Sequence, residues 1–205
     1  FYTQKLEPDY NQILKYLTFV RKAFRKDVDF VCGYEAGCLG FTLYHQLTQH
    51  GVSCVILAPT TMMKPAGKKK IAALIARCLA SNNFSPVHVP TTQDEEVKEF
   101  LRMRDDHRLA LKKVKQQILA FCLRHGYSYT ATKNHWTVAH IAWLRSLKPE
   151  GLYSEILSEY LLTFQALSDK LERLDWRIEE LAAMKAYSEG VKKLSCFLGI
   201  KTHTA

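Results

Sequence analysis

Glu35 is the residue of this 205-residue chain whose type and position most favour chemistry. It stands between Gly33 and Gly37, directly after a short apolar run that predicts a buried strand. At the carboxyl edge of a parallel sheet, strand-end side chains face a ligand crevice. A carboxylate there suits Mg²⁺, which prefers hard oxygen ligands, although two-metal nuclease chemistry needs several carboxylates together. The alternative is a solvated turn residue, and the residues around Glu35 leave both interpretations open.

Other acidic and histidine pairs have spacings that suit a metal poorly. Asp105 and Asp106 are consecutive, so on a helix their side chains would diverge by about 100° and belong to a charged surface. His135 and His140 are five residues apart, not the four that align two ligands on one helical face. Neither pair is predicted to bind a metal.

Basic side chains exceed acidic ones, with 29 Lys and Arg against 20 Asp and Glu and a formal net charge of +9. This excess favours a polyanionic partner such as a nucleic acid or an anionic surface, although a basic enzyme without one is the alternative. Two groups are predicted to contact nucleic-acid phosphates, namely Lys64, Lys68, Lys69, Lys70 and Arg77 near a strand–helix junction, and Lys112, Lys113 and Lys115 on a long helix. The alternative for such runs is a solvated face.

The composition excludes several classes of protein. Hydrophobic residues make up 47% and charged residues 24%, which disfavours disorder and collagen. No apolar stretch approaches the roughly 20 residues of a membrane span, so no membrane partner is expected. The six cysteines form no Cys-x-x-Cys pair and are predicted to be free thiols in a reducing cytoplasm. A zinc site made of Cys32, Cys38 and His45 matches no standard ligand pattern.

The elements that would position Glu35 alternate between helix and strand patterns over residues 1–90. Asp9 is predicted to cap the first helix, and Gly51 to end the second. The predicted strands lie at 28–32 and 52–58, with a short extended piece at 86–89, and the predicted helices lie at 10–24, 39–47 and 71–80. This order predicts an α/β domain built from βαβ units with a parallel sheet.

From residue 91 the pattern becomes helical. A capping box of Thr92 and Glu95 predicts the start of a helix that continues to residue 125, roughly 50 Å long. Arg104 and His107 occupy two positions of its otherwise apolar stripe. Asn134 is predicted to cap a shorter helix that ends at Leu147.

A third helical stretch carries apolar residues at strictly alternating spacings of three and four. We call these residues the seam: Leu157, Tyr160, Phe164, Leu167, Leu171, Leu174, Ile178 and Leu181. Such a stripe predicts a coiled coil, because an isolated helix would leave it in water. Its partner is either the 92–125 helix folded back or a second subunit, which would make the chain a homo-oligomer, a dimer or a tetramer.

Several segments, taken in order, resemble one protein family. They are Tyr34-Glu35-Ala36-Gly37, the strand pattern of 52–59, the loop with Lys64-Pro65 and Gly67-Lys68, the Ala-rich helix of 72–80, the Leu101-Arg102 helix, and Gly199-Ile200 with Thr204-Ala205. Together they resemble the DEDD transposases of the insertion-sequence "one-ten" class. The resemblance covers nearly the whole chain.

This resemblance implies a RuvC-like (RNase H-like) α/β domain at 1–90 whose first strand is missing. A long α-helical coiled-coil region at 91–189 and the start of a C-terminal transposase domain at 190–205 would follow. The implied activity is DNA transposition or recombination with Mg²⁺, guided by a structured RNA, in a bacterial cytoplasm and associated with the nucleoid. The family's active site combines four acidic residues with a serine, and Glu35 matches the second acidic position.

The other active-site residues of the family have no counterpart here. The first acidic residue is expected before Phe1 and the serine beyond Ala205, while Lys70-Ile71 runs directly into Ala72, where the family has two aspartates. The chain is therefore expected to be part of a longer protein, with segments omitted rather than lost, and inactive by itself. The alternative function is a non-catalytic, oligomerising module that binds nucleic acid.

Overall fold

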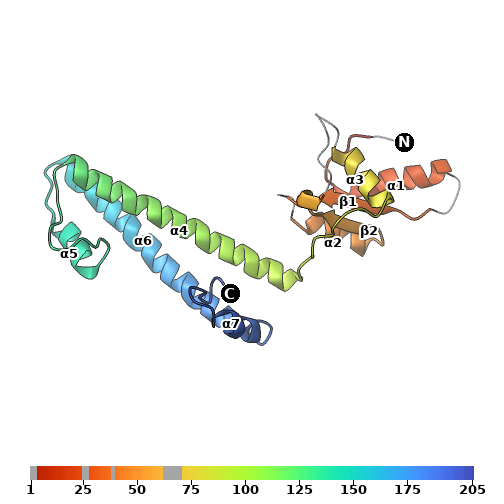
Figure 1. Ribbon diagram of the computed structural model, residues 1–205. Coiled ribbons are helices and arrows are strands. Elements are labelled where there is room, and N and C mark those ends of the chain that lie inside the picture. The colour runs from red at the N-terminus through yellow and green to blue at the C-terminus, as the bar shows by residue number, and fades with distance from the viewer. Residues whose placement is uncertain (1–3, 25–27, 38–39, 62–70) are drawn as a thin grey trace. The chain divides into compact units, whose positions relative to one another are not determined.

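The computed structural model describes residues 4–24, 28–37, 40–61 and 71–205 (Figure 1). The chain forms two compact units, Phe1–Pro90 and Thr91–Ala205. None of the helices in the described ranges combines the length and the apolarity that crossing a bilayer requires.

The first unit is a small parallel sheet with helices. Its helices are α1 (Tyr10–Phe24), α2 (Thr42–Gln49), α3 (Ile71–Ala80) and a short 3-10 turn, η1 (Pro59–Thr61). Strands β1 (Val31–Glu35) and β2 (Ser53–Leu57) pair in parallel, in a register that runs from Val31 opposite Ser53 to Glu35 opposite Leu57. The Asp9 side chain accepts a hydrogen bond from the Gln12 backbone N–H at 2.9 Å, as the predicted cap of α1 requires.

One sequence-based prediction for this unit is wrong in position and another in strand pairing. The first strand lies at Val31–Glu35, not at 28–32, because the ladder with β2 continues through Gly33 to Glu35. The piece at 86–89 does not add a parallel strand, since Pro86 forms only an isolated antiparallel bridge with Leu57. Proline lacks the N–H that a longer ladder needs.

The second unit is a helical hairpin. It consists of α4 (Thr92–Arg124), α5 (Val138–Ser146), α6 (Leu152–Ala182) and α7 (Ser188–Leu194), and Figure 1 shows α6 running back alongside α4. Contacts between residues far apart in the sequence fix the antiparallel direction. Arg104 pairs with Asp175, and Tyr187 donates a hydrogen bond to Asp94 at 2.7 Å.

The helix caps of the second unit differ from the predicted ones. The capping box at the start of α4 uses Thr91 and Asp94, one residue before the predicted Thr92 and Glu95. The Thr91 Oγ1 accepts from the Asp94 N–H at 3.2 Å, and the Asp94 carboxylate accepts from the Thr91 N–H at 3.3 Å. Thr137, and not Asn134, caps α5, because its hydroxyl accepts from the His140 N–H at 3.3 Å.

The seam packs inside the chain. Leu157, Phe164, Leu171 and Ile178 are buried, and the alternate seam residues Tyr160, Leu167, Leu174 and Leu181 are half-buried. The core of the hairpin joins α4, α5 and α6 through Val114, Ile118, Phe121, Cys122, Leu144, Leu157 and Phe164. Of the two partners that the sequence left open, the structure therefore has the intramolecular one.

Candidate functional site

Glu35 lies at the carboxyl end of the parallel pair. It is the last residue of β1, half-buried, and opposite Leu57 at the end of β2. The Ala36 N–H donates to the Leu57 carbonyl oxygen at 2.9 Å, so the backbone stays ordered one residue past the strand. The Tyr34 hydroxyl donates to the Gly40 carbonyl oxygen at 3.0 Å and ties the following loop to the strand. This is the edge of a parallel sheet where ligand crevices form.

Gly33 lets a helix approach the strand that carries Glu35. A Cβ atom at Gly33 would lie 2.8 Å from Leu79 Cδ1 and 3.0 Å from Leu57 Cδ1, closer than carbon atoms normally come. Leu57, Ile75 and Cys78 form the buried cluster of this unit, so α3 packs on the sheet beside the position without a side chain. The absent side chain thus lets α3 pack closely against the strand that carries Glu35.

The carboxylate of Glu35 supplies one hard oxygen ligand of the kind that Mg²⁺ takes. Within the ranges that the structure describes, no three His, Cys, Asp or Glu side chains converge as a metal site. The residues present fit the ion in part, since Glu35 can serve as a single ligand or as a hydrogen-bond acceptor. Of the zinc site considered above, Cys38 lies outside the described residues, and burial raises the pKa of the Cys32 thiol.

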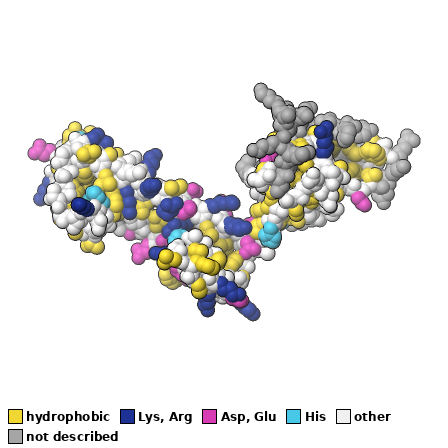
Figure 2. Space-filling view, in the orientation of Figure 1, with side chains coloured by type: hydrophobic (Ala, Val, Ile, Leu, Met, Phe, Trp, Pro, Cys, Tyr) yellow, Lys and Arg dark blue, Asp and Glu magenta, His cyan; other side chains and the backbone are white. Residues whose placement is uncertain are grey.

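The residues predicted to contact phosphate differ in whether the structure describes them and in how exposed they are. Lys64, Lys68, Lys69 and Lys70 lie outside the described residues. Arg77 on α3 and the neighbours Lys112 and Lys113 on α4 are exposed, as a phosphate contact requires. Figure 2 shows Lys and Arg side chains of the hairpin interspersed with acidic ones, not gathered into one patch.

Lys115 differs from its neighbours on α4. Its ammonium nitrogen lies 5.2 Å from the centre of the Trp136 ring and 5.7 Å from that of Phe164. A cation over an aromatic face is attracted by the ring quadrupole, so this lysine helps attach the connection before α5 to the hairpin. Lys115 is therefore less available for a phosphate contact than Lys112 or Lys113.

An ion pair that sequence reasoning missed joins the two long helices. Arg104 Nε and Nη2 donate to the two carboxylate oxygens of Asp175 at 2.7 and 3.1 Å, a bidentate arrangement. Only 11% of the Arg104 side chain is exposed, against 48% for Asp175. In the sequence, Arg104 is a polar residue in an otherwise apolar stripe. An antiparallel alignment of the two helices would have indicated its partner.

Two adjoining clefts surround this ion pair. One, of about 550 Å³, is lined by Arg104, Asp175, Ser195, Lys201 and His203 among others. The second, of about 510 Å³, adds Arg102, Asp105 and Arg108. The arginines here are held by carboxylates, with Arg108 Nε 2.9 Å from Asp105, and these cations lower the pKa of Asp105. The clefts are therefore lined by both acidic and basic side chains.

His140 at the far end of the hairpin is completely buried. Its Nδ1 accepts from the Trp136 N–H at 3.1 Å, which places the proton of the neutral ring on Nε2. In the described part of the chain, neither Nε2 nor the buried Tyr129 hydroxyl has a hydrogen-bond partner. Burial lowers the pKa of His140, with a smaller contribution from His135. This histidine belongs to an aromatic cluster with Tyr129, Trp136 and Trp143.

Two curated bacterial proteins are similar to this chain. It is 32% identical over 194 residues to "Transposase for insertion sequence element IS1533" of Leptospira borgpetersenii, an alignment that covers 91% of this chain. It is 31% identical over 117 residues to "Putative transposase y4qE" of Sinorhizobium fredii, which covers 55% of this chain. No protein-family model and no solved structure matches the chain. The aligned regions span 56% and 30% of the two relatives.

Proposed function

We propose that this chain is part of an insertion-sequence transposase that cuts and rejoins DNA. The observation that carries the proposal is the 32% identity to the Leptospira transposase, which extends over 91% of the chain. Because the alignment includes residues of both units, the similarity is not confined to one common motif. The net charge of +9 agrees with a DNA partner.

The finer proposal is a RuvC-like first unit of the "one-ten" class. It is supported by the order helix, strand, helix, strand, helix and by the parallel pairing of β1 with β2. Glu35 at the carboxyl edge of this pair is the residue that we assign to catalysis. Bound Mg²⁺ would stabilise negative charge at the scissile phosphate. Glu35 would help to hold the ion through its carboxylate, and the hydrogen bond from the Ala36 N–H to the Leu57 carbonyl oxygen keeps the backbone in place at the end of the strand.

Nucleic-acid binding is assigned to the exposed basic residues Arg77, Lys112 and Lys113. Phosphate contacts by such side chains are insensitive to base sequence and weaken as salt rises. A structured guide RNA is the second polyanion that the resemblance implies, and the same side chains would serve it. Association with the bacterial nucleoid would follow from this binding.

The catalytic assignment is tested by Glu35→Gln in a full-length protein that contains this chain. Excision of the element should be abolished, since the amide removes the anionic ligand and keeps the size of the side chain. Glu7→Gln, at an exposed position of the same unit, is the matched control and should leave excision unchanged. Undiminished excision by the Glu35 variant would contradict the assignment and favour the non-catalytic nucleic-acid-binding module.

The binding assignment is tested with the 205-residue chain itself and duplex DNA. Lys112→Ala with Lys113→Ala should reduce the slope of log K against log salt by about two, since each phosphate contact contributes about 0.9. Lys15→Ala, at an exposed position on α1, is the control. A slope that the double variant leaves unchanged would contradict the assignment. A structured RNA of equal length, used as a competitor, shows which of the two polyanions is preferred.

A further inference from the structure

The second half of α4, the connection after it and α5 carry no acidic residue. Between Asp106 and Glu150 the sequence has no Asp or Glu, although the whole chain has 20. We call residues 107–149 the basic segment, and its cationic side chains are Arg108, Lys112, Lys113, Lys115, Arg124, Lys133, Arg145 and Lys148. Like charges without counter-charges repel one another, so such a segment is typical of a surface that binds a polyanion.

Most cations of the basic segment have no acidic partner, in contrast to those elsewhere in the hairpin. Arg102, Arg177 and Lys193, outside the segment, lie 2.9, 2.6 and 2.7 Å from a carboxylate oxygen. Within the described ranges, no carboxylate pairs with six exposed cations of the segment, namely Lys112, Lys113, Arg124, Lys133, Arg145 and Lys148. These side chains are available to phosphates.

Two of these cations share one side of α4. Lys113 and Arg124 are eleven residues apart, which is close to three helical turns, so about 16 Å separates them along the same stripe. Gln117 and Ala120 lie between them on that side, and neither carries a charge. A phosphate backbone can therefore follow the stripe to the end of α4 without meeting an acidic residue of that helix.

An exposed aromatic ring lies at the far end of the hairpin, where α4 ends and α6 begins. Tyr153, in the first turn of α6, is 51% exposed. Its ring centre is 4.3 Å from that of His125, which follows Arg124 directly, and the His125 ring centre is 4.6 Å from that of the buried Phe121. The tyrosine is thus held by packing on one side and exposed on the other. Unpaired bases stack on aromatic side chains of this kind, whatever their sequence.

The carboxylates at the start of α6 lie away from this ring. Glu155 and Glu159 are two and six residues after Tyr153, which places them about 200° and 240° round the helix. Glu150 is exposed in the connection before α6, and Lys148 lies two residues before it. The ring side of the helix is therefore accessible to a phosphate backbone that approaches along α4.

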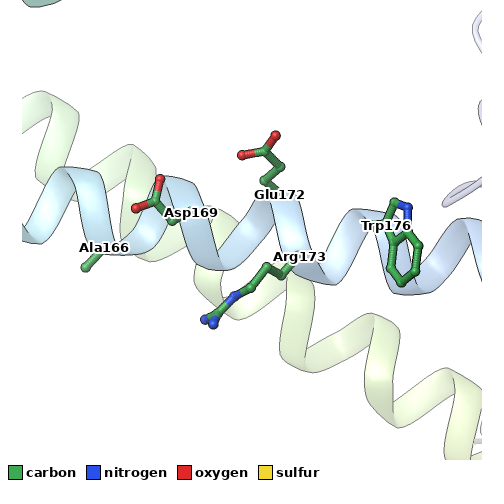
Figure 3. Close-up of a pocket in the computed structure, with 5 residues that line it drawn as sticks. All are labelled: Ala166, Asp169, Glu172, Arg173 and Trp176. Atoms are coloured by element: carbon green, nitrogen blue, oxygen red, sulfur yellow. The ribbon is translucent and has the colours of Figure 1, made fainter.

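A second exposed aromatic side chain on α6 has different neighbours. Trp176 is 68% exposed and lines an open groove of about 870 Å³ together with Asp169 and Glu172. Figure 3 shows the indole and the two carboxylates on the one helix. Carboxylates repel phosphates, so this part of α6 is unsuited to a nucleic acid. The basic segment has both features that a single strand requires, unpaired cations and an exposed ring.

We propose that the basic segment binds a single strand of nucleic acid, with phosphates along the Lys113–Arg124 stripe and an unpaired base stacked on Tyr153. This inference rests on the nucleic-acid binding proposed above and adds which form of nucleic acid the end of the hairpin recognises. A duplex keeps its bases paired and stacked inside, so it would contact the lysines of α4 but would place no base on the tyrosine.

The test uses the complete 205-residue chain and fluorescence anisotropy with three labelled probes: a single-stranded RNA, a single-stranded DNA and the corresponding DNA duplex. Tyr153→Ala should raise the Kd for a single strand at least about fivefold, because it removes a stacking platform. Its Kd for the duplex should change less than about twofold. A selective loss with either single-stranded probe supports the proposal, and the larger loss identifies the preferred strand.

Variants at the same position separate stacking from folding. Tyr153→Phe retains the ring and should bind single strands as the parent does, whereas Tyr153→Leu keeps apolar bulk over His125 and should lose affinity as the alanine variant does. Circular dichroism at 222 nm should be the same for all three. Trp176→Ala removes an exposed aromatic side chain from the acidic part of the same helix and is the matched control, which should leave all three Kd values unchanged.

The phosphate contacts are tested by their salt dependence. Arg124→Ala with Lys148→Ala should reduce the slope of log K against log salt for a single strand by about 1.4, since each contact contributes about 0.7. Arg173→Ala, at an exposed position of α6 beside Glu172, is the control and should leave the slope unchanged.

Three results would overturn the proposal. If Tyr153→Ala leaves single-strand binding unchanged while Lys112→Ala with Lys113→Ala still lowers the salt slope for the duplex, the proposed function stands and the single-strand site does not. An equal loss for the duplex and the single strands would show that no unpaired base is recognised. A chain that binds none of the three probes would overturn both this inference and the binding assignment on which it rests.

Discussion

The two units of this chain have different kinds of hydrophobic core. The hairpin has a core of seven buried residues from three helices, supplied by a pattern that repeats along α4 and α6. Among the described residues of the first unit, Leu57, Ile75 and Cys78 from β2 and α3 form one buried cluster. The core of the hairpin follows from a pattern that repeats along the sequence, whereas the packing of the small cluster also requires that one position, Gly33, has no side chain. Glu35, the residue that we assign to chemistry, lies in the first unit, on the strand that pairs with β2.

The largest effect should come from a charge in the seam. Leu171→Asp places a carboxylate at a buried position and should reduce the free energy of unfolding by about 4 kcal/mol or more. Urea unfolding followed by circular dichroism at 222 nm measures this loss. Leu162→Asp, at a position 63% exposed on the same helix, should change it by less than about 0.5 kcal/mol. Similar losses for both variants would mean that α4 does not cover the seam.

A smaller effect is expected from filling the gap beside β1. Gly33→Val adds side-chain atoms where even a Cβ would meet Leu79 and Leu57, so the first unit should lose about 2 kcal/mol by overpacking. Hydrogen exchange of the β2 amides reports on this unit by itself. Gly37→Ala is the control, because its nearest neighbour is the Glu35 carbonyl oxygen at 3.9 Å. If β2 exchange is unchanged in the Gly33 variant, α3 does not pack as closely as described.

The ion pair between the long helices should matter less than the seam. Asp175→Asn leaves the mostly buried Arg104 without its bidentate partner and should cost about 1–2 kcal/mol, at the low end because Asp175 is half-exposed. Arg104→Met removes the charge and keeps much of the volume, so its cost should be smaller. Urea unfolding compares the two variants. A larger loss for the methionine variant would show that the arginine stabilises the hairpin beyond satisfying its own charge.

The smallest effect should be a pH dependence of the hairpin caused by His140. Burial lowers the pKa of this histidine below its usual 6.5, so below that pH the unfolded chain takes up a proton before the folded one. The free energy of unfolding should therefore be level above about pH 6.5 and fall as the pH drops toward the folded pKa. His140→Leu should flatten this part of the profile, whatever it does to stability at pH 7. An unaltered slope would assign the effect to another group.

The sequence predicted the hairpin well because its information is local and repeated. The extent of α4 and the stripe of the seam follow from spacings along the chain; in the structure α4 covers Thr92–Arg124, and every second seam residue is buried while the others are half-buried. The alternative partners of the seam could not be separated from sequence. A stripe of apolar residues specifies that it is covered but not which helix covers it. The missed pairing of Arg104 with Asp175 follows from the same lack of information on direction.

The first unit was predicted less accurately, for a physical reason. The limits of a strand depend on its pairing with another strand. The apolar run before Gly33 predicts a strand that starts at residue 28, whereas β1 starts three residues later, at Val31. Gly33 lies inside β1, where the absence of a side chain allows close packing of α3. Glu35 was nevertheless expected at the edge of a parallel sheet and lies there. Its catalytic role stays a prediction.

The hydrogen bond between Tyr187 and Asp94 joins residues at the two ends of the hairpin sequence. The chain therefore enters and leaves the hairpin at one place, while α5 is carried at the far end of helices about 50 Å long. The length of the hairpin and the place where the chain enters and leaves it are therefore independent of each other. Adding one heptad to each long helix would move the far end by about 10 Å and leave the entry and exit points where they are. The hairpin could thus become longer through insertions of equal length in α4 and α6, with no change near Asp94 and Tyr187.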